Sequence, residues 1–421
     1  MKREHLIIPC CLLFIASLFL SVAVALKVIT MGLVILAALI NNPIRQKIHL
    51  LKERKAIWFM LAFAVLLFTS SFFSSNHHAA SRFVQLRLPL VLFPLSIGLI
   101  QLSKDQRNKI LLGIASIVTI CCFISLCYSI FRYRQHHDTA WLYNDALSFL
   151  IGQQSIYTSL LVNMSIYIFA YHLLYSRLSG GYKFWLGFGI IFLFIISYLL
   201  ASRNMMLILY ASTIGFSFYY IFKKKKWLEG ATLIMGMIIA GFLIFKFFPK
   251  TINRFKELAF TQFDYQSQAK ESHYAGQLTS DQWNGANFRL AAWQCGWQIF
   301  KEHPIAGVGL GDKKDELFKV YEQKQFHFAI ATNKNVHNNY LDILYSLGII
   351  GFILFFAGWI FFPAIQFAQS KDGLALLILI TFSLAMITEN YFDRSLGALL
   401  VGFFVPFLIS CKKPGIKARF R

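Results

Sequence analysis

The chain has 421 residues, of which 57% are hydrophobic and only 14% are charged. This composition differs from that of a soluble globular domain and is typical of a polytopic membrane protein. The net charge of +22 does not indicate nucleic-acid binding, because the Lys and Arg residues lie mostly in short runs between apolar stretches, where they orient helices in a bilayer. We therefore expect membrane lipids, and no nucleic acid, among its partners.

The apolar stretches predict an all-α integral membrane protein with about twelve transmembrane helices. The first stretch follows Lys2 and Arg3 and has the length of a full span, so we interpret it as an uncleaved helix rather than a signal peptide. The second is short, and the fourth contains Pro89 and Pro94. The predicted spans are 6–26, 28–41, 56–74, 86–102, 109–131, 155–175, 183–201, 203–222, 228–248, 337–363, 372–388 and 396–411.

The spans divide the chain into three predicted regions. Residues 1–248 form an N-terminal bundle of about nine helices, 249–336 a long hydrophilic loop, and 337–421 about three C-terminal helices. Only one cysteine, Cys295, belongs to the long loop, and the other six lie in or beside apolar stretches, so no disulfide framework is indicated.

The basic connections predict the orientation of the helices. With twelve spans and the N-terminus inside, every basic cluster falls on the cytoplasmic side, and so do both chain ends. These clusters lie at 45–55, 104–109, 177–183, 223–226 and 412–421. The outer side then receives the loop 249–336, the segment 132–154, Arg82, Arg87 and Arg203.

Within the loop, a repeat of apolar residues at helical spacing predicts an amphipathic helix that lies on the membrane or over a cavity. Arg289 lies at the edge of the apolar stripe, and Pro304 ends the pattern. The stripe consists of Leu290, Trp293, Trp297 and Phe300.

His337 and Asn338 lie where the polar loop meets the apolar helix that follows. The pattern places the imidazole near the outer mouth of that helix, although a histidine at a helix start is also common as a capping or interfacial residue. Arg203 interrupts an apolar region where one helix leaves the membrane and the next returns. Such a charge indicates a partner, an anionic ligand or an interfacial position.

Three other patterns are better explained by structure than by ligand binding. Gly307–Gly311 resembles a dinucleotide motif but follows a helix, so we interpret it as a turn. The acidic cluster 312–316 contains lysines and is interpreted as a solvated loop. The histidine pairs at 77–78 and 136–137 lack a third ligand at a usual spacing, so we expect no metal site.

Two arginines and one histidine on the outer side match the needs of glycosyl transfer from a lipid diphosphate. Guanidinium groups at Arg203 and Arg289 would neutralise the leaving diphosphate, and the imidazole of His337 would accept the proton of the attacking hydroxyl. Because a lipid-linked donor arrives activated, no nucleotide-sugar site or cofactor is expected.

The same motifs resemble those of a known family. His337-Asn338 followed by Gly348–Gly351 resembles the histidine motif of the bacterial O-antigen ligases, and Arg203–Leu207 resembles their short arginine motif. The segment 289–309 is similar to the end of their large periplasmic loop. The resemblance covers roughly residues 190–360.

The resemblance implies a GT-C-type glycosyltransferase of the bacterial inner membrane. It would transfer polysaccharide from undecaprenyl diphosphate to the lipid A core at the periplasmic face, with inversion and without a metal. His337 would be the base or would orient the acceptor, and Arg203 and Arg289 would hold the diphosphate. Further candidates for substrate binding, chosen because they are polar and on the outer side, are Arg82, Arg87, Gln154 and Asn338.

Three alternatives stay open at this point. Polymerases of the same superfamily use the same donor, but the glycine expected eleven residues after each arginine is replaced by Ile214 and Phe300. Protein O-oligosaccharyltransferases are disfavoured by the short C-terminal tail. A lipid-linked sugar flippase or transporter should carry charges along its helices, whereas the predicted spans between the first and the seventh are nearly free of them.

Overall fold

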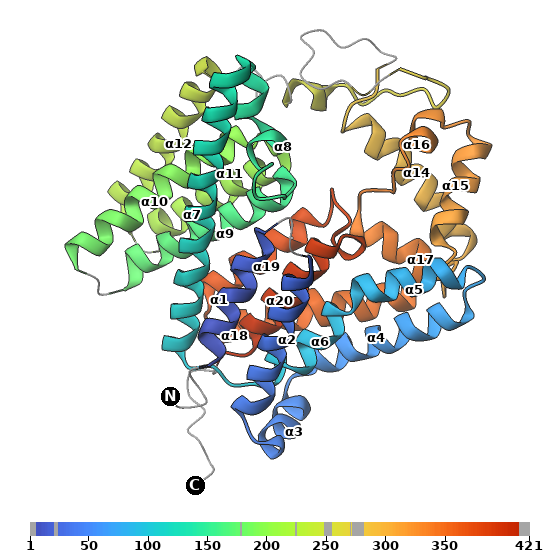
Figure 1. The fold of residues 1–421 in the computed structure, drawn as a ribbon, viewed down its shortest axis with the longest axis horizontal. Helices are drawn as coiled ribbons and strands as arrows, with labels where there is room; N and C mark the ends of the chain where they lie inside the picture. Colours follow the sequence, from blue (N-terminus) through green and yellow to red (C-terminus); the bar gives the residue numbers. More distant parts are fainter. Residues whose placement is uncertain are drawn as a thin grey trace. The chain divides into compact units, whose positions relative to one another are not determined.

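The computed structural model describes residues 6–20, 24–176, 179–223, 225–247, 255–269, 271 and 282–411, and these residues fold as helices and connections (Figure 1). Within these ranges the extended pairings are two isolated bridges, Leu102 with Cys411 and Glu271 with Trp283. The predicted all-α class is therefore confirmed. The predicted basic chain ends at 1–5 and 412–421, Arg177, and parts of the loop at 248–254 and 272–281 lie outside the described residues.

The chain divides into two compact units, which we describe separately. The first comprises residues 1–113, 263–269 and 288–421, and the second comprises 114–262 and 270–287. The units are grouped by contact rather than by order in the chain, because the C-terminal helices pack on the first helices of the sequence. The three-region division made from hydropathy stays a prediction.

The N-terminal part of the first unit consists of short and long apolar helices joined by tight connections. In order they are α1 (Ile7–Leu18), α2 (Val24–Asn41), α3 (Ile44–Glu53), α4 (Lys55–Phe73), α5 (His77–Arg87) and α6 (Pro89–Leu95), followed by a 3-10 turn at Ile97–Leu99. The helix α7 (Lys104–His136) begins in the first unit and continues in the second.

The C-terminal part of the first unit packs on α4 and α6. Its elements are α14 (Asn287–Glu302), α15 (Lys313–Gln323), α16 (His327–Ala331), α17 (Asn339–Phe356), α18 (Phe362–Gln369), α19 (Gly373–Ala385), a 3-10 turn at Tyr391–Asp393, and α20 (Ser395–Ile409). A π-helical turn, Ala357–Phe361, joins α17 to α18, and α20 is buried along nearly its whole length against α6.

The second unit is a bundle of apolar helices. It contains α8 (Asn144–Leu147), α9 (Ser155–Tyr175), α10 (Gly180–Leu199), α11 (Arg203–Phe218) and α12 (Trp227–Phe247). The central helix is α9, which is buried on nearly every face and packs against α10. The amide of Asn163 in α9 donates to the carbonyl of Met205 at 2.8 Å, which ties α9 to the first turn of α11.

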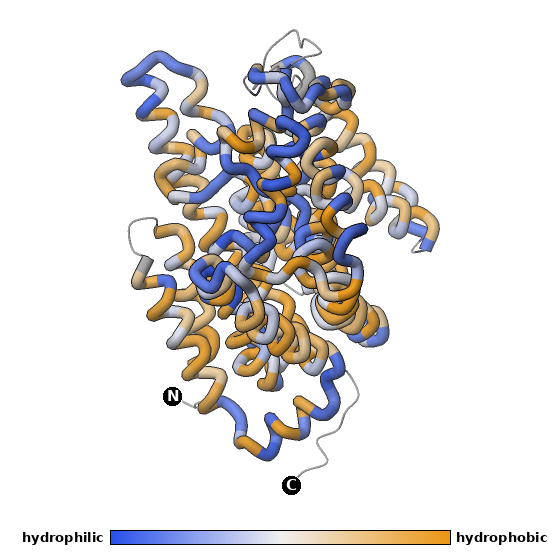
Figure 2. The backbone as a smooth tube through the Cα atoms, turned by 90° about the vertical axis from the view of Figure 1, so that its right-hand side faces the viewer, coloured by the Kyte–Doolittle hydropathy of each residue, from blue (hydrophilic) through white to orange (hydrophobic). Residues whose placement is uncertain are grey.

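Among the described residues, seven helices are long and apolar enough to cross a membrane, and an eighth span results if α2 and α3, bent by 100°, count as one. Four shorter apolar helices accompany them, which are α1, α12, α19 and α20. These are the helices of a multi-pass membrane protein, and Figure 2 shows apolar residues along them, with hydrophilic residues concentrated in the connections. Every predicted apolar stretch corresponds to one of these helices.

The predicted fourth span is shifted. It was expected to begin at residue 86, whereas the structure has an apolar helical stretch from His77 to Leu99, so Arg82 and Arg87 lie within it. Asn76 starts the helix because its side chain accepts a hydrogen bond from the backbone N–H of Ala79 at 3.0 Å. Arg87 was assigned to the outer side, but its charge is buried against carboxylates, as described below.

The predicted helix in the loop is confirmed, but its protein-facing side differs from the predicted stripe. The helix α14 begins at Asn287 and ends at Glu302, two residues before Pro304. Its buried face consists of Phe288, Ala291, Ala292, Cys295, Gly296 and Ile299. Trp297, from the predicted stripe, is 48% exposed. The helix therefore has a second apolar side, which is partly exposed.

The helix α17 is broken at Gly348, and the turn after α14 fills the break. Gly348 has φ 65° and ψ −168°, which are not helical values. The backbone N–H groups of Val308 and Gly309 donate to the carbonyls of Tyr345 and Ser346 at 3.0 and 2.9 Å. These bonds satisfy polar backbone groups inside an apolar helix. The glycine string is therefore a turn, as predicted, with positive φ at Gly307 and Gly309.

We expect the Gly348→Ala variant to be strongly destabilised. A Cβ atom there would lie 2.1 Å from the carbonyl oxygen of Ile305, and the positive φ adds backbone strain, so the loss is about 2–4 kcal/mol in the free energy of unfolding. Thermal unfolding of the purified protein in detergent measures it. The control is Gly32→Ala in α2, where a Cβ atom meets nothing within 4 Å. Equal unfolding temperatures for the two variants would contradict the packing described here.

Candidate functional site

His337 lies directly before α17, with its side chain only 17% exposed. Its neighbour Asn338 is the N-cap of the helix, since the side-chain oxygen accepts from the N–H groups of Tyr340 and Leu341, both at 3.0 Å. The predicted substrate-binding residue Asn338 thus has a structural role at this position. Its capping fixes where the helix starts and where the preceding imidazole lies.

The backbone of His337 is held in an unfavourable conformation. Its φ is 46°, in the left-handed region that non-glycine residues adopt at a cost of about 1–3 kcal/mol. Its N–H donates to the side-chain oxygen of Asn335 at 3.0 Å, and the carbonyl of Val336 accepts from the indole N–H of Trp293 at 2.9 Å. Such strain persists when surrounding contacts enforce it, and it is typical of functional sites.

The imidazole of His337 is paired with a buried carboxylate. Its Nδ1 lies 3.1 Å from Oε2 of Glu389, a residue 52 positions away. Burial raises the pKa of Glu389, but the hydrogen bond and charge of His337, together with the charges of Arg289 and Arg394, lower it further, so the pKa lies below its usual value. Glu389 is therefore ionised at neutral pH and orients the ring through Nδ1, and Nε2 is the ring nitrogen that does not contact Glu389.

Two arginines accompany this pair. The Nε of Arg289, from α14, donates to the carbonyl of Thr388 at 3.1 Å. The Nε of Arg394 lies 4.0 Å from Oε1 of Glu389, and the Arg394 side chain is about half exposed. We call His337, Glu389, Arg289 and Arg394 the histidine cluster. The structure thus brings together Arg289 and His337, two of the three residues predicted to act in concert.

Arg203 and Gln154 belong to the second unit. Arg203 is the first residue of α11 and is half-buried. Gln154 is the exposed N-cap residue of α9, and its backbone carbonyl accepts from the N–H of Tyr157 at 3.1 Å. Both lie at helix starts, as the span prediction required. That Arg203 and Gln154 lie close to the histidine cluster remains a prediction.

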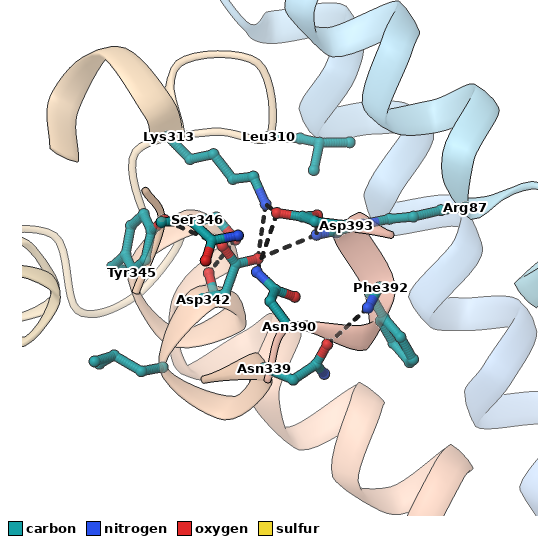
Figure 3. A network of polar contacts seen from close by, with 12 residues as sticks. Arg87, Leu310, Lys313, Asn339, Asp342, Tyr345, Ser346, Asn390, Phe392 and Asp393 are labelled. Atoms are coloured by element: carbon teal, nitrogen blue, oxygen red, sulfur yellow. Dashed lines mark hydrogen bonds and ion pairs between the residues drawn. The ribbon is translucent and has the colours of Figure 1, made fainter. Parts of the chain in front are cut away.

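Arg87 lies in a buried network of four charged side chains (Figure 3). Its Nη2 contacts Oδ1 of Asp393 at 2.8 Å and Oδ2 of Asp342 at 3.2 Å. From the other side, Nζ of Lys313 contacts Asp393 and also Oδ2 of Asp342, the latter at 2.7 Å. We call these four residues the buried quartet, and each is less than 10% exposed.

The quartet is electrically balanced and joins four elements. Two cations face two carboxylates, and Tyr345 and Asn390 add hydrogen bonds to Asp342 and Asp393 at 3.1 and 3.0 Å. Burial raises the pKa of Asp393, but Lys313 and Arg87 lower it, so its pKa lies below the usual value. The network ties α5, α15, α17 and the turn Tyr391–Asp393 together.

The predicted substrate role of Arg87 therefore needs correction, because its guanidinium group is buried and bound to two aspartates of the protein itself. Arg82 differs from it, since it is exposed on α5 five residues earlier. The outer-side charge at Arg87 was recognised from the sequence, but its partners lie about 250 and 300 residues away and are not visible there.

The connection between α19 and α20, residues 386–394, carries residues of both networks. Its backbone is pinned to the start of α17, since the N–H of Asn339 donates to the carbonyl of Met386 at 2.9 Å and the Asn339 side-chain oxygen accepts from the N–H of Phe392 at 3.0 Å. Glu389, Asp393 and Arg394 were not singled out from the sequence. The sequence did place these three charged residues between two predicted spans, on the outer side in the predicted orientation, and this position could have marked them as candidates.

A polar hollow of about 830 Å³ lies elsewhere in the first unit, between the start of α5, the turn after α14 and the start of α15. The acidic residues in it have protein partners. Asp312 accepts from the backbone N–H groups of Ser75 and Asn76 at 2.9 and 2.7 Å, and Asp315 accepts from the Asn76 amide at 2.8 Å. The predicted solvated loop is therefore wrong, because residues 312–316 form the start of α15, and two of its carboxylates bind the residues just before α5. The described residues include no group of three or more potential metal ligands.

The fold and site define a class, which is an all-helical multi-pass membrane protein with a carboxylate-oriented histidine beside arginines at a helix mouth. Residues 188–356 match the family model of the O-antigen ligases. The match covers Arg203, Arg289 and His337, and it supports membership of the O-antigen ligase superfamily, which the motifs predicted. Glu389 and Arg394 lie beyond the matched residues. No curated protein matches the chain.

We expect Lys313→Met to destabilise the protein by about 3–5 kcal/mol, because it leaves two buried carboxylates with one cation. The double variant Lys313→Met with Asp342→Asn restores the charge balance and should recover much of the loss. The control Lys314→Met removes the neighbouring, exposed lysine. Unfolding of Lys313→Met at the wild-type temperature would show that the quartet does not hold these elements together.

Stability should fall at acidic pH. Asp393 and Glu389 have pKa values in the folded protein below those of the unfolded chain, so their stabilising effect is complete above about pH 4 to 5 and is lost as pH falls through the folded-state values. The measurement is the unfolding temperature between pH 7 and 3. Asp393→Asn should flatten the profile. A wild-type protein that becomes more stable between pH 5 and 3 would contradict the assignment.

Proposed function

We propose that the protein is an O-antigen ligase, an inverting glycosyltransferase that transfers polysaccharide from undecaprenyl diphosphate to the lipid A core oligosaccharide. The observation that carries this proposal is the hydrogen bond between His337 and Glu389, with Arg289 bound to the adjacent carbonyl of Thr388. An oriented imidazole beside guanidinium groups fits a reaction in which a hydroxyl loses a proton and a diphosphate leaves.

In the proposed step, the oxygen of the acceptor hydroxyl attacks the anomeric carbon of the donor sugar, and the bond from that carbon to the diphosphate oxygen breaks. A single displacement inverts the anomeric centre. The hydroxyl proton passes to Nε2 of His337, and the electron pair of the broken bond leaves with undecaprenyl diphosphate. Glu389 stabilises the imidazolium that forms, as carboxylates do for catalytic histidines in general.

The leaving diphosphate needs positive charge as its bond breaks. Arg289 and Arg394 are placed at the histidine cluster, and Arg203 is proposed to join them from the start of α11. Guanidinium groups bind phosphate oxygens through paired N–H donors and remain charged at every physiological pH. With arginines in this role, the reaction requires neither a metal nor a nucleotide. The exposed Arg82 and Gln154 remain proposals for contact with the glycans.

The same proposal assigns a location and an architecture. The chain would lie in the bacterial inner membrane as a twelve-span GT-C-type protein, with both termini in the cytoplasm. The histidine cluster and the loop 249–336 would face the periplasm. The positions of Glu389 and Arg394, between the last two predicted spans, agree with this orientation, because that connection and His337 fall on the same predicted side.

Other acceptors and another class of protein remain to be separated by experiment. A polymerase or a protein O-oligosaccharyltransferase would use the same cluster on a different acceptor. A flippase or transporter is disfavoured because its charges should follow a path through the bundle, whereas Arg87 and Asp342, which lie in apolar helical stretches, bind each other. These charges are paired within the buried quartet rather than arranged along a path.

Replacing His337 by Ala should abolish transfer in a purified system that contains the lipid-linked donor and lipid A core, because no group then accepts the proton. Glu389→Gln should lower kcat about 10²- to 10⁴-fold, since the imidazolium loses its counter-charge. The exposed His303→Ala serves as the control and should keep wild-type activity. Product is followed by the mobility shift of the glycosylated acceptor.

The choice of acceptor tests the remaining alternatives in the same assay. Transfer to lipid A core supports a ligase, growth of the lipid-linked glycan supports a polymerase, and transfer to a polypeptide supports a protein glycosyltransferase. Full activity of His337→Ala would remove the imidazole from the mechanism. Movement of the donor across vesicles without any transfer would favour the flippase.

A further inference from the structure

The helix α3 turns away from α2 by 100° instead of continuing its span. Pro43 lies at the bend and cannot donate a backbone hydrogen bond, so the helix is interrupted there. The eighteen residues of α2 are by themselves about 27 Å long, close to the thickness of the apolar core of a bilayer. Val28 and Leu36 of α2 are 60% and 59% exposed, as expected of a helix that faces lipid. With α2 across the membrane, the bend directs α3 along the membrane surface (Figure 1).

One side of α3 is held against the protein by cations that bind backbone carbonyls. The Nζ of Lys47, which is 6% exposed, donates to the carbonyl of Ala38 at 3.0 Å and also to that of Leu39. These two carbonyls belong to the last turn of α2, where no intrahelical partner is available for them. Arg54, directly after α3, donates to the carbonyl of Ile100 at 2.9 Å. The position of α3 at the end of α2 is therefore fixed by contacts within the protein.

The other side of α3 carries an apolar stripe beside a basic one. Ile44 and Ile48 are 69% and 48% exposed, and Leu51, one turn further, is half-buried. Arg45 and Lys52 are both exposed and lie roughly a quarter turn around the helix from this stripe. Within the described part of the chain, neither cation has a hydrogen-bond or ion-pair partner for its side chain. Their charges are therefore available to a ligand outside the protein.

This arrangement fits the boundary between the acyl chains and the head groups of a bilayer. A helix that lies in this boundary buries its apolar stripe among the acyl chains and presents its basic residues to the phosphate groups. Lys and Arg side chains near the membrane surface are attracted to anionic lipids. The same residues therefore do more than orient the neighbouring helices, which was the role expected from the sequence for the basic connection 45–55.

We infer that α3 binds anionic phospholipids of the bilayer. Ile44 and Ile48 lie among the acyl chains, and Arg45 and Lys52 bind the phosphate groups. Because Lys47 ties α3 to the last turn of α2, this contact anchors the end of α2 at the membrane surface. The inference concerns elements other than the histidine cluster and does not depend on the reaction proposed for that cluster.

The test is amide hydrogen exchange of the full-length protein in lipid nanodiscs, made either of phosphatidylcholine or of phosphatidylcholine mixed with phosphatidylglycerol. We expect exchange in residues 44–53 to slow roughly threefold or more with phosphatidylglycerol, because lipid contact suppresses local opening of the helix. The double variant Arg45→Gln with Lys52→Gln should lose this lipid dependence. Ile44→Ser with Ile48→Ser should speed the exchange of α3 in both membranes, because the apolar stripe no longer inserts.

The matched control is Lys314→Gln with Lys319→Gln, which removes two exposed lysines from α15. It should keep the lipid dependence of α3. Thermal unfolding in detergent shows whether each variant is folded. High salt gives a readout that needs no substitution, since screening of the head-group charges should reduce the effect of phosphatidylglycerol on wild-type α3.

Equal exchange of α3 in the two membranes would overturn the inference, and so would a lipid dependence that persists in the Arg45→Gln, Lys52→Gln variant. Slowing that follows the number of protein copies in each nanodisc, and not the lipid, would assign this side of α3 to a second copy of the chain and would also overturn it. Absence of sugar transfer by the wild-type protein would count against the proposed function alone.

Discussion

The buried quartet is the interaction on which the organisation of the first unit depends. Isolated charges cannot remain inside an apolar environment, so Arg87 and Lys313 must each find a carboxylate, and Asp342 and Asp393 must each find a cation. The four come from segments spread over some 300 positions of the chain. Their pairing therefore specifies one arrangement of α5, α15, α17 and the 386–394 connection, because most alternative arrangements would leave a charge buried without a partner.

The position of the histidine cluster depends on the same segments as the buried quartet. The 386–394 connection contributes Asp393 to the quartet and Glu389 to the imidazole, and Asn339 binds its backbone at two places. With the connection fixed, Glu389 fixes the ring of His337, while Trp293 and Asn335 hold the backbone around it. A reactive side chain in a strained conformation needs this kind of support, since the strain would otherwise relax.

The polar turn after α14 packs into the break in α17 at Gly348. The helix gives up regular hydrogen bonds at Gly348, and the turn replaces them with bonds of its own. In a membrane helix an unsatisfied backbone group costs several kcal/mol, so such a break is possible only where protein fills it. Gly307 and Gly348 are needed because the two backbones approach closely there, and all three glycines, at 307, 309 and 348, have a positive φ.

The sequence by itself determined the class of protein and most of its helices. Apolar length and the basic connections are local properties, so they located every apolar helix and placed His337 at a helix mouth. Local motifs also singled out Arg203, Arg289 and His337 within what proved to be a family domain. The residues of α14 that are buried against the protein were not identified from the sequence, because apolar character does not reveal which neighbour a side chain packs against.

Only the tertiary structure decided the partners of the charged residues. Glu389 is an ordinary acidic residue in the sequence until the fold brings it 3.1 Å from an imidazole 52 positions away, and Arg87 looked like a surface cation until two aspartates were found beside it. Hydropathy treats each charge as a cost to be placed outside the membrane. The role of a charged residue depends on which opposite charge lies in contact with it in the folded protein. The distance between two such residues cannot be read from the local sequence.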